Sequence, residues 1–171
     1  IKRIYAAKVQ IEQALTRAKW SETKLPADVT EELSRHEEGF TAAMDDDLNT
    51  AQAMGHVFGL VRLAGRLMED KTMAKSRETA EILRRILDDL AVWGSVLGVL
   101  GTDSQTFLAA LKACRLTRLG IDAARVDNLV AERQEVRKAK DFARSDAIRD
   151  ELAGLGITVM DTPAGPQWDI A

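Results

Sequence analysis

The sequence predicts a mainly α-helical protein, in which a helical bundle is followed by a small α+β module of two helices and a β-hairpin. Three observations indicate this class. Apolar residues recur at helical spacing from the start of the chain to about residue 118. From Ile121 onward the helical segments become rich in charge. Only the last stretch, ITVMDTPAGPQWDI, shows the alternation of a strand. We therefore expect two domains, residues 1–118 and residues 119–171.

Five helices are predicted in the first domain, each from one apolar face. The faces consist of Ile4, Ile11 and Leu15; Leu33, Phe40 and Met44; Met54, Val57, Phe58, Val61, Ala64, Gly65 and Met68; Ile82, Leu83, Ile86, Leu90, Trp93 and Leu97; and Phe107, Leu108 and Leu111. Asp28 is a candidate N-cap of the second helix, and Asp103 or Ser104 of a short fifth helix. Gly101 is expected to end the fourth helix. The polar residues 69–76 are expected to form a linker between the third and fourth helices.

The second domain is predicted to contain two charged helices and a hairpin. Asp122 is a candidate N-cap of the first of these helices. Asp141 restarts a helix, which Gly156 closes. The final segment alternates apolar and polar residues, turns at a stretch with Pro163 and Gly165, and returns as QWDI.

The composition is typical of a soluble globular protein. Of the 171 residues, 46% are hydrophobic and 30% are charged, and the formal net charge is −3. This charge disfavours a globally basic, non-specific nucleic-acid binder, but it allows a local basic patch. No apolar run approaches membrane-spanning length and no signal-peptide pattern opens the chain. We therefore expect no membrane partner and a cytoplasmic location.

The chain has one cysteine and two histidines. Cys114 is the only cysteine, which leaves no internal disulfide. Its apolar neighbours at helical spacing predict a buried, inert thiol. His36 and His56 have no partner at the spacing of metal ligands, and we expect both to be structural.

A run of three aspartates, Asp45–Asp47, is compatible with a metal site or with the start of a helix. With Asn49 it matches the first positions of a calcium-binding loop, but Thr50 stands where that loop needs Gly and His56 where it needs a bidentate Glu. Asn49 and Gln52 have the spacing of a capping box, and acids are favourable before a helix N-terminus. We therefore predict a helix start and no metal site.

Residues 133–144 form the most basic segment. Its charged side chains are Arg133, Arg137, Lys138, Lys140 and Arg144 against Glu135 and Asp141, which sum to +3. Four of the basic residues would lie on one face if the helix were continuous. One interpretation is a solvated helical face with ion pairs. The other is a surface for single-stranded RNA, with Phe142 as a stacking plane and Asp146 and Arg149 as partners for base edges. Spacing alone leaves both open, and leaves Phe142 open as a core residue.

Two segments resemble one known family, the cysteinyl-tRNA synthetases. The first is AMDDD-x-NT, preceded by Phe40 and followed by an amphipathic helix. The second, LVAERQEVRKAKDFARSDAIRDELAGLGITVMDTPAGPQW, is similar nearly throughout to the end of the bacterial members. Its matching positions are Arg137, Lys140, Asp141, Phe142, Asp146, Arg149, Asp150, Gly156, Ile157, Asp161, Pro163, Gly165 and Trp168. The resemblance is weaker over residues 1–35 and 70–120.

The resemblance implies that the second domain binds the anticodon of cysteine tRNA, GCA, and that the bundle contacts the stem. The residues implied in base reading are Arg137, Phe142, Asp146, Arg149 and Asp161, and Lys138 and Lys140 suit the phosphates. Many bacterial members have Trp at the position of Phe142, so a stacking plane is kept here but the indole N–H donor is lost. Trp168 is expected to pack the hairpin against the helices.

The resemblance also implies parts that this sequence lacks. These are a nucleotide-binding Rossmann domain with a HIGH signature, a KMSKS loop and a zinc that reads the cysteine thiol. Residues 71–76, KTMAKS, look a little like that loop but fall inside the bundle, where a solvated linker is expected. The chain opens without an initiator Met and already in helical rhythm, and we interpret it as the carboxy-terminal half of a longer polypeptide.

The expected enzyme is therefore full-length cysteine-tRNA ligase, with this fragment inactive alone. The full-length family uses ATP, magnesium and zinc, and we expect no cofactor in the fragment. The expected partners are cysteine tRNA and the missing N-terminal catalytic domain.

Two other functions remain in view. A paralogous ligase that joins cysteine to a small amine shares the bundle but lacks the terminal module, and the intact RKAKDFARSDAIRDEL disfavours it. A helical protein-interaction domain without an RNA role would expose the apolar stripe around Trp93 instead of burying it.

Overall fold

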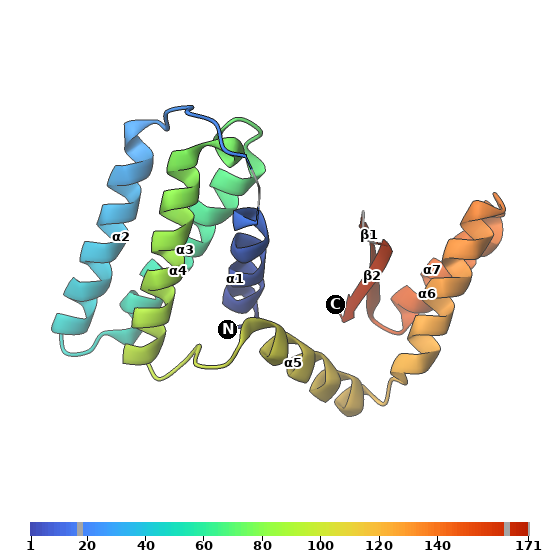
Figure 1. Cartoon of the computed structure of the whole chain (residues 1–171). Helices are drawn as coiled ribbons and strands as arrows, with labels where there is room; N and C mark the ends of the chain where they lie inside the picture. Colours follow the sequence, from blue (N-terminus) through green and yellow to red (C-terminus); the bar gives the residue numbers. More distant parts are fainter. Residues whose placement is uncertain (17–18, 163–164, 171) are drawn as a thin grey trace. The chain divides into compact units, whose positions relative to one another are not determined.

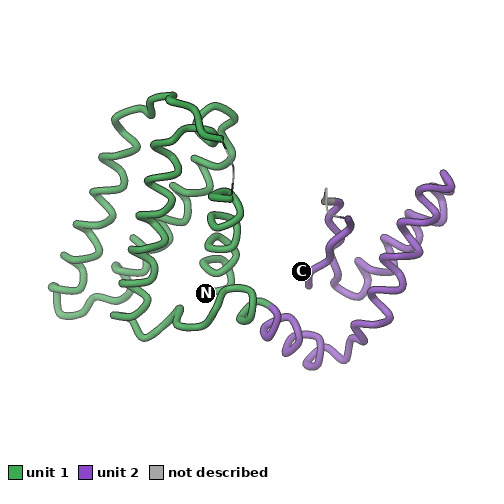
Figure 2. Tube along the Cα trace, in the orientation of Figure 1, with its two compact units in different colours: residues 1–108 green, residues 109–171 purple. Residues whose placement is uncertain are grey.

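The structure is a computed structural model that describes residues 1–16, 19–162 and 165–170, so the predicted turn residue Pro163 lies outside it. Over this range the chain forms seven α-helices, a short 3-10 helix and a two-stranded antiparallel sheet (Figure 1). The mainly α fold class with a terminal hairpin is confirmed. The chain divides into two compact units, residues 1–108 and 109–171 (Figure 2). This division falls inside the fifth helix, because the second half of that helix supplies Leu116 to the second core.

Unit 1 is a helical bundle whose core is formed by the apolar helix faces that the sequence indicates. Its elements are α1 (Lys2–Leu15), α2 (Ala27–Asp45), α3 (Thr50–Glu69), η1 (Met73–Lys75), α4 (Arg77–Val96) and the start of α5 (Ser104–Leu119). One continuous core joins α1 to α4, and Ile4, Leu60 and Ile86 have no exposed surface. Burial of such side chains contributes roughly 1.5–3 kcal/mol each.

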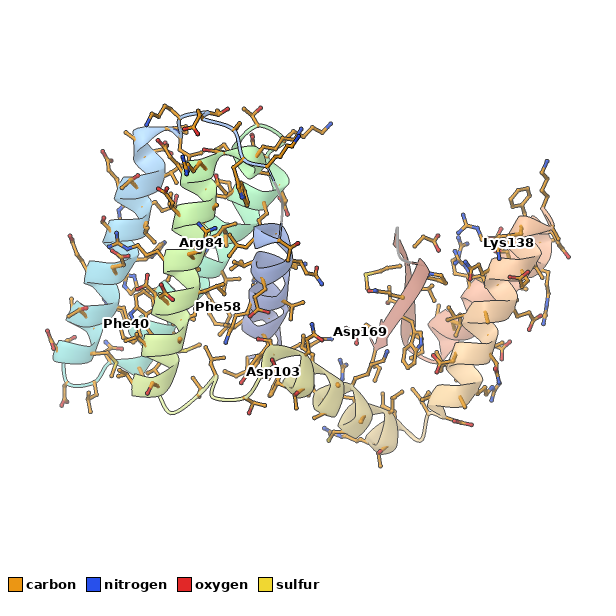
Figure 3. All side chains as sticks on the ribbon, viewed as in Figure 1. Phe40, Phe58, Arg84, Asp103, Lys138 and Asp169 are labelled. Atoms are coloured by element: carbon orange, nitrogen blue, oxygen red, sulfur yellow. The ribbon has the colours of Figure 1, made fainter. Side chains whose placement is uncertain are left out.

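The apolar stripe of α4 faces this core. Trp93 is 6% exposed, and its ring stacks on Phe40 of α2 with centroids 4.2 Å apart. Phe40 lies on α2 in Figure 3. The apolar stripe around Trp93 therefore forms part of the bundle core. A helical protein-interaction domain would need this stripe to be exposed, so the structure disfavours that alternative function.

The acidic run lies between two helices. Asp45 is the last residue of α2, and Asp47 and Leu48 turn the chain with φ of 51° and 57°. Asn49 caps α3 by accepting from the Gln52 backbone N–H at 3.1 Å. The predicted helix start at Asn49 is confirmed.

Three helix ends differ from the prediction. The N-cap of α2 is Pro26 and not Asp28, which lies in the first turn. Helix α4 ends at Val96, and Gly98, with φ of 67°, follows it in the left-handed conformation in place of Gly101. Helix α5 is 16 residues long and not short, because its second half continues into unit 2.

The predicted linker between the third and fourth helices, residues 69–76, joins α3 to α4 and is exposed at residues 69–72 and 75, but part of it packs against the bundle. Asp70 accepts from the backbone N–H groups of Thr72 and Met73 and so shapes η1. Ala74 and Ser76 are buried. Ser76 caps α4, and its neighbours Lys75 and Arg77 exchange backbone hydrogen bonds with Ser21. The segment is therefore built into the bundle.

The histidines hold α2 and α3 together. The Nδ1 atoms of His36 and His56 are 3.3 Å apart. Each ring also lies on a glycine of the opposite helix, because a Cβ at Gly39 would overlap the His56 ring and a Cβ at Gly59 would overlap the His36 ring. The two helices therefore approach through a reciprocal contact between a glycine and an imidazole.

This contact makes the stability of unit 1 depend on pH. Burial, followed by the facing His56, lowers the pKa of His36 from 6.5. Between the lowered pKa and 6.5 the folded protein binds fewer protons than the unfolded chain, so the free energy of unfolding falls as the pH drops through this range. We expect the change in the urea unfolding midpoint from pH 7.5 to pH 5.5 to be less favourable for the wild type than for His36→Gln.

The comparison with His36→Gln isolates this effect from another titration. Burial and Glu37 raise the pKa of Asp89 to about 6, which changes stability in the opposite direction and is common to both proteins. Equal pH slopes for the two proteins would contradict the prediction.

Unit 2 consists of the end of α5, α6 (Ala123–Lys138), α7 (Phe142–Gly154), β1 (Ile157–Thr162) and β2 (Gly165–Ile170). The strands pair antiparallel, with Ile157 opposite Ile170. Asp122 and Asp141 accept from the backbone at the starts of α6 and α7, and Gly156, with φ of 73°, follows α7, as predicted. The second core consists of Leu116, Val126, Val130, Ile148, Leu152, Ile157 and Ile170.

Trp168 fastens the hairpin to the helices, in agreement with its predicted role. Its indole N–H donates to Asp127 Oδ1 of α6 at 2.7 Å. Lys112 of α5 lies over the ring, 3.2 Å from its centroid, and donates to the Trp168 carbonyl. The nearby Cys114 is exposed, not buried as predicted. It lies on a different face of α5 from Leu116, which enters the core.

Candidate nucleic-acid interface

The basic segment is split by a sharp turn. Helix α6 ends at Lys138, Lys140 adopts φ of 62°, and Asp141 caps α7. The chain reverses, so that Arg144 of α7 donates to Glu132 of α6 at 2.9 Å. The single continuous face that the spacing of the basic residues would give is therefore not formed.

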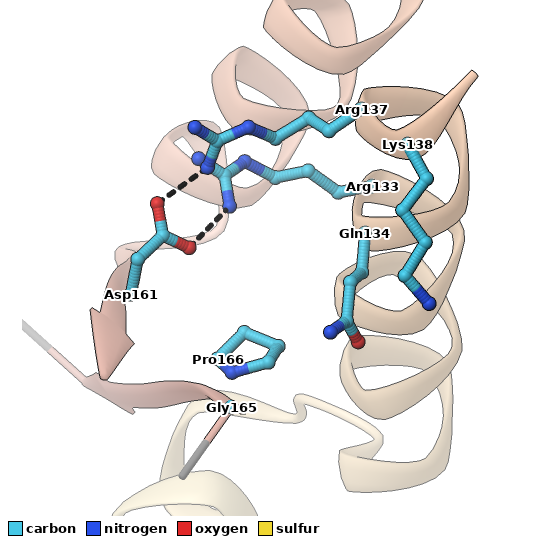
Figure 4. A pocket seen from close by; sticks show the side chains of 7 residues that line it. All are labelled: Arg133, Gln134, Arg137, Lys138, Asp161, Gly165 and Pro166. Atoms are coloured by element: carbon cyan, nitrogen blue, oxygen red, sulfur yellow. Dashed lines mark hydrogen bonds and ion pairs between the residues drawn. The ribbon is translucent and has the colours of Figure 1, made fainter. Parts of the chain in front are cut away.

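A pocket of about 340 Å³ lies between α6 and the hairpin. Its lining residues are Arg133, Gln134, Arg137, Lys138, Asp161, Gly165 and Pro166 (Figure 4). Arg133 donates to Asp161 Oδ1 at 3.1 Å, and Arg137 donates to Asp161 Oδ2. One carboxylate of the hairpin therefore holds two guanidinium groups of α6.

Asp161 lines this pocket as a hydrogen-bond acceptor. The hydrogen bonds from Arg133 and then from Arg137 hold its pKa below 3.8. The carboxylate is thus ionised at neutral pH, when it only accepts hydrogen bonds. Its oxygens have lone pairs left beyond the two arginine bonds, and the side chain is about half exposed.

Arg133 is a member of the pocket that the sequence did not single out for base reading. Its side chain is 11% exposed, and its Nε is buried without a hydrogen-bond partner among residues 1–16, 19–162 and 165–170. Arg133 and Asp161 are 28 residues apart, and no local pattern predicts their contact. The only signal was membership of the basic segment.

Phe142 is the first residue of α7 and is 63% exposed. The core-packing interpretation of this ring is therefore excluded. Phe142, Asp146 and Arg149 follow each other at i, i+4 and i+7, beside the face of α7 that enters the core. Arg149 pairs with Asp146 at 3.4 Å, and both are well exposed. The three side chains form one polar–aromatic face, which we call the α7 face.

The structure brings three of the seven predicted site residues into the pocket, namely Arg137, Lys138 and Asp161. Lys138, labelled in Figure 3, lies at the end of α6 and pairs with Glu135 at 2.7 Å. Phe142, Asp146 and Arg149 lie on the α7 face instead. Lys140 is exposed in the turn between the helices and makes no ion pair with any residue that the structure describes.

Neither a metal site nor a membrane-spanning helix accompanies this surface. Among the residues with described positions, no group of three or more His, Cys, Asp or Glu side chains is placed to hold a metal ion. No described helix combines the length and the apolar character needed to cross a bilayer.

Both units match known protein families. Residues 39–101 match the family model described as the DALR domain. Residues 123–168 match the family model described as the cysteinyl-tRNA ligase anticodon binding domain. Together they define the class of the chain, which contains the helical and anticodon-binding domains of an aminoacyl-tRNA ligase. The second match covers the module that the paralogous ligase lacks.

Curated relatives give the particular family. The chain is 88% identical over 171 residues to cysteine–tRNA ligase of Solidesulfovibrio magneticus. It is 54% identical over 170 residues to that of Nitratidesulfovibrio vulgaris (strain Hildenborough). In both cases it spans 35% of the relative's length. The chain belongs to the cysteine–tRNA ligase family.

Proposed function

We propose that this chain is the tRNA-binding region of a cysteine-tRNA ligase and recognises the anticodon of cysteine tRNA. The observation that carries the proposal is the exposed ring of Phe142 at a turn with paired Arg and Asp side chains on either side. Single-stranded RNA is read by stacking bases on such planes and by bonding their edges to charged and amide groups.

Each residue has a role that follows from its chemistry. Phe142 stacks on a base, which contributes about 1–3 kcal/mol. Asp146 and Asp161 accept from base amino or imino groups, and Arg137 and Arg149 donate to carbonyls and ring nitrogens. Lys138 and Lys140 hold phosphates, which gives affinity that weakens with salt and carries no sequence information.

The proposal places the chemistry of charging outside this chain. ATP, magnesium and the zinc of the family belong to the part of the relatives that the chain does not cover, and the fragment alone is inactive. Unit 1 contacts the stem of the tRNA, and residues 119–171 form the anticodon module. The protein works in the cytoplasm, where tRNA is charged.

A binding titration tests the proposal. The chain is titrated with cysteine tRNA and with the same tRNA carrying an anticodon other than GCA, at low and at physiological salt. We expect the native anticodon to bind at least tenfold more tightly, which is about 1.4 kcal/mol. The preference should persist when added salt lowers both affinities.

Equal binding of the two RNAs, with both lost in salt, would contradict the proposal. Only phosphates would then be held, and base reading by Arg137, Phe142, Asp146, Arg149 and Asp161 would be wrong for this chain.

A further inference from the structure

Asp161 is held by two arginines that differ in their access to a ligand. Arg137 is 46% exposed, so its remaining N–H groups face the pocket and can meet an RNA base. Arg133 lines the same pocket but is only 11% exposed; its Nε is buried and one of its other nitrogens donates to Asp161, so less of its guanidinium is open to a ligand. Each arginine donates to a different oxygen of the carboxylate. A single bond from Arg137 would still allow the carboxylate to rotate, and the bond from Arg133 fixes its second oxygen.

We propose that Arg133 is a positioning residue for base recognition. It holds the Asp161 carboxylate, and through it the Arg137 guanidinium, so that an acceptor stands beside a donor at the mouth of the pocket (Figure 4). The ligand is a nucleobase edge on which a donor lies beside an acceptor. The inference rests on the proposed function and adds to it a residue that does not itself touch the RNA.

A purely structural role does not account for Arg133. The hairpin is already attached to α6 by the bond from Trp168 to Asp127 and by the burial of Ile157 and Ile170 in the second core. Arg133 adds a buried Nε without an acceptor in the described part of the chain, which costs stability. The bond that offsets this cost goes to Asp161, at the rim of the pocket.

The hydrogen bonds from Arg133 and Arg137 also restrict the conformation of the Asp161 side chain, which helps it to accept from a base. The two hydrogen bonds hold the two carboxylate oxygens in place. An aspartate without these two hydrogen bonds would instead populate several rotamers.

A double-mutant cycle tests whether Arg133 acts through Asp161. The variants are Arg133→Lys, Asp161→Asn and the two together. For each, the ratio of the dissociation constants for the altered and native anticodons is measured, with the salt dependence and the thermal unfolding of the variant. Arg125→Lys is the matched control, because Arg125 also lies on α6 and pairs across to another element, Glu151 of α7, outside the pocket.

We expect Arg133→Lys to lower the anticodon preference at least fivefold and to leave the salt slope unchanged, because the charge is kept. In the Asp161→Asn background the same change should alter the preference less than twofold. Arg125→Lys should keep the wild-type preference.

Four outcomes separate this inference from the proposed function. A wild-type chain without anticodon preference overturns both. A preference that survives Arg133→Lys overturns the role of Arg133 alone, and so does an effect of equal size in the Asp161→Asn background. Failure of Arg133→Lys to fold, where Arg125→Lys folds, also overturns it, because Arg133 would then be needed for the fold itself.

Discussion

Phe142→Ala is expected to lower the affinity of the chain for cysteine tRNA by roughly 5- to 150-fold, the loss of one stacked base. Its free energy of unfolding should stay within about 0.5 kcal/mol of the wild-type value, since little of the ring is buried. Filter binding and urea unfolding give the two quantities. Loss of binding without loss of stability is the result that separates a recognition residue from a core residue.

Two further variants test this expectation. Phe142→Trp should bind at least as tightly as the wild type, because a larger plane stacks as well and brings an N–H donor. Met160→Ala removes another exposed apolar side chain of the same unit, 49% exposed on β1, and should leave binding unchanged. Equal losses for Phe142→Ala and Met160→Ala would mean that unspecific apolar contact, and not stacking, supports RNA binding.

The second large effect is expected at the contact between α2 and α3. Gly59→Ala places a methyl group where the His36 ring lies. The ring must swing away and lose its bond to His56, so we expect a destabilisation of about 1–3 kcal/mol, typical of overpacking. Urea unfolding measures it.

The matched control lies one turn away on the same helix. A methyl group at Gly55 would meet no described atom within 4 Å, so Gly55→Ala should stabilise α3 by about 0.5–1 kcal/mol. His36→Ala should then relieve most of the cost of Gly59→Ala when the two are combined. If both glycine variants changed stability in the same direction, the reciprocal contact would not control how the helices approach.

Local signals predicted the parts of this fold that local chemistry determines. Asn49, Asp122 and Asp141 begin helices because a short side chain that accepts from the next backbone N–H groups is sufficient for a cap. The turn after α7 follows from Gly156, which adopts a positive φ at little cost. Such features depend on a few neighbouring residues and can be read from them.

Contacts between distant residues could not be predicted in this way. The bonds of Asp161 to Arg133 and Arg137 join a hairpin to a helix, and nothing near any of these residues indicates the pairing. The contact of His36 with His56 depends on how α2 crosses α3. The end of α4 differs from the prediction for a similar reason, because Leu100 packs close to Gly94 and both Gly98 and Leu100 adopt positive φ.

The family resemblance supplied the predicted site residues, and the structure shows why spacing alone could not decide between a core and an exposed position for Phe142. Phe142 follows a cap, and a phenyl ring at that place is equally compatible with a core and with solvent until the core is known. Once Ser145, Ile148 and Leu152 fill the inner face of α7, the ring of Phe142 has no place inside.

The pairing of Arg137 with Asp161 and of Arg149 with Asp146 has a consequence for the time course of recognition. Each of these side chains already has an ion-pair partner in the absence of RNA, so under the proposed function we expect a smaller loss of conformational entropy on binding than for unpaired side chains. Under the proposed function, Lys138 and Lys140 would attract every tRNA alike and set the rate of encounter. We then expect correct and incorrect tRNAs to associate at similar rates and to differ in their dissociation rates.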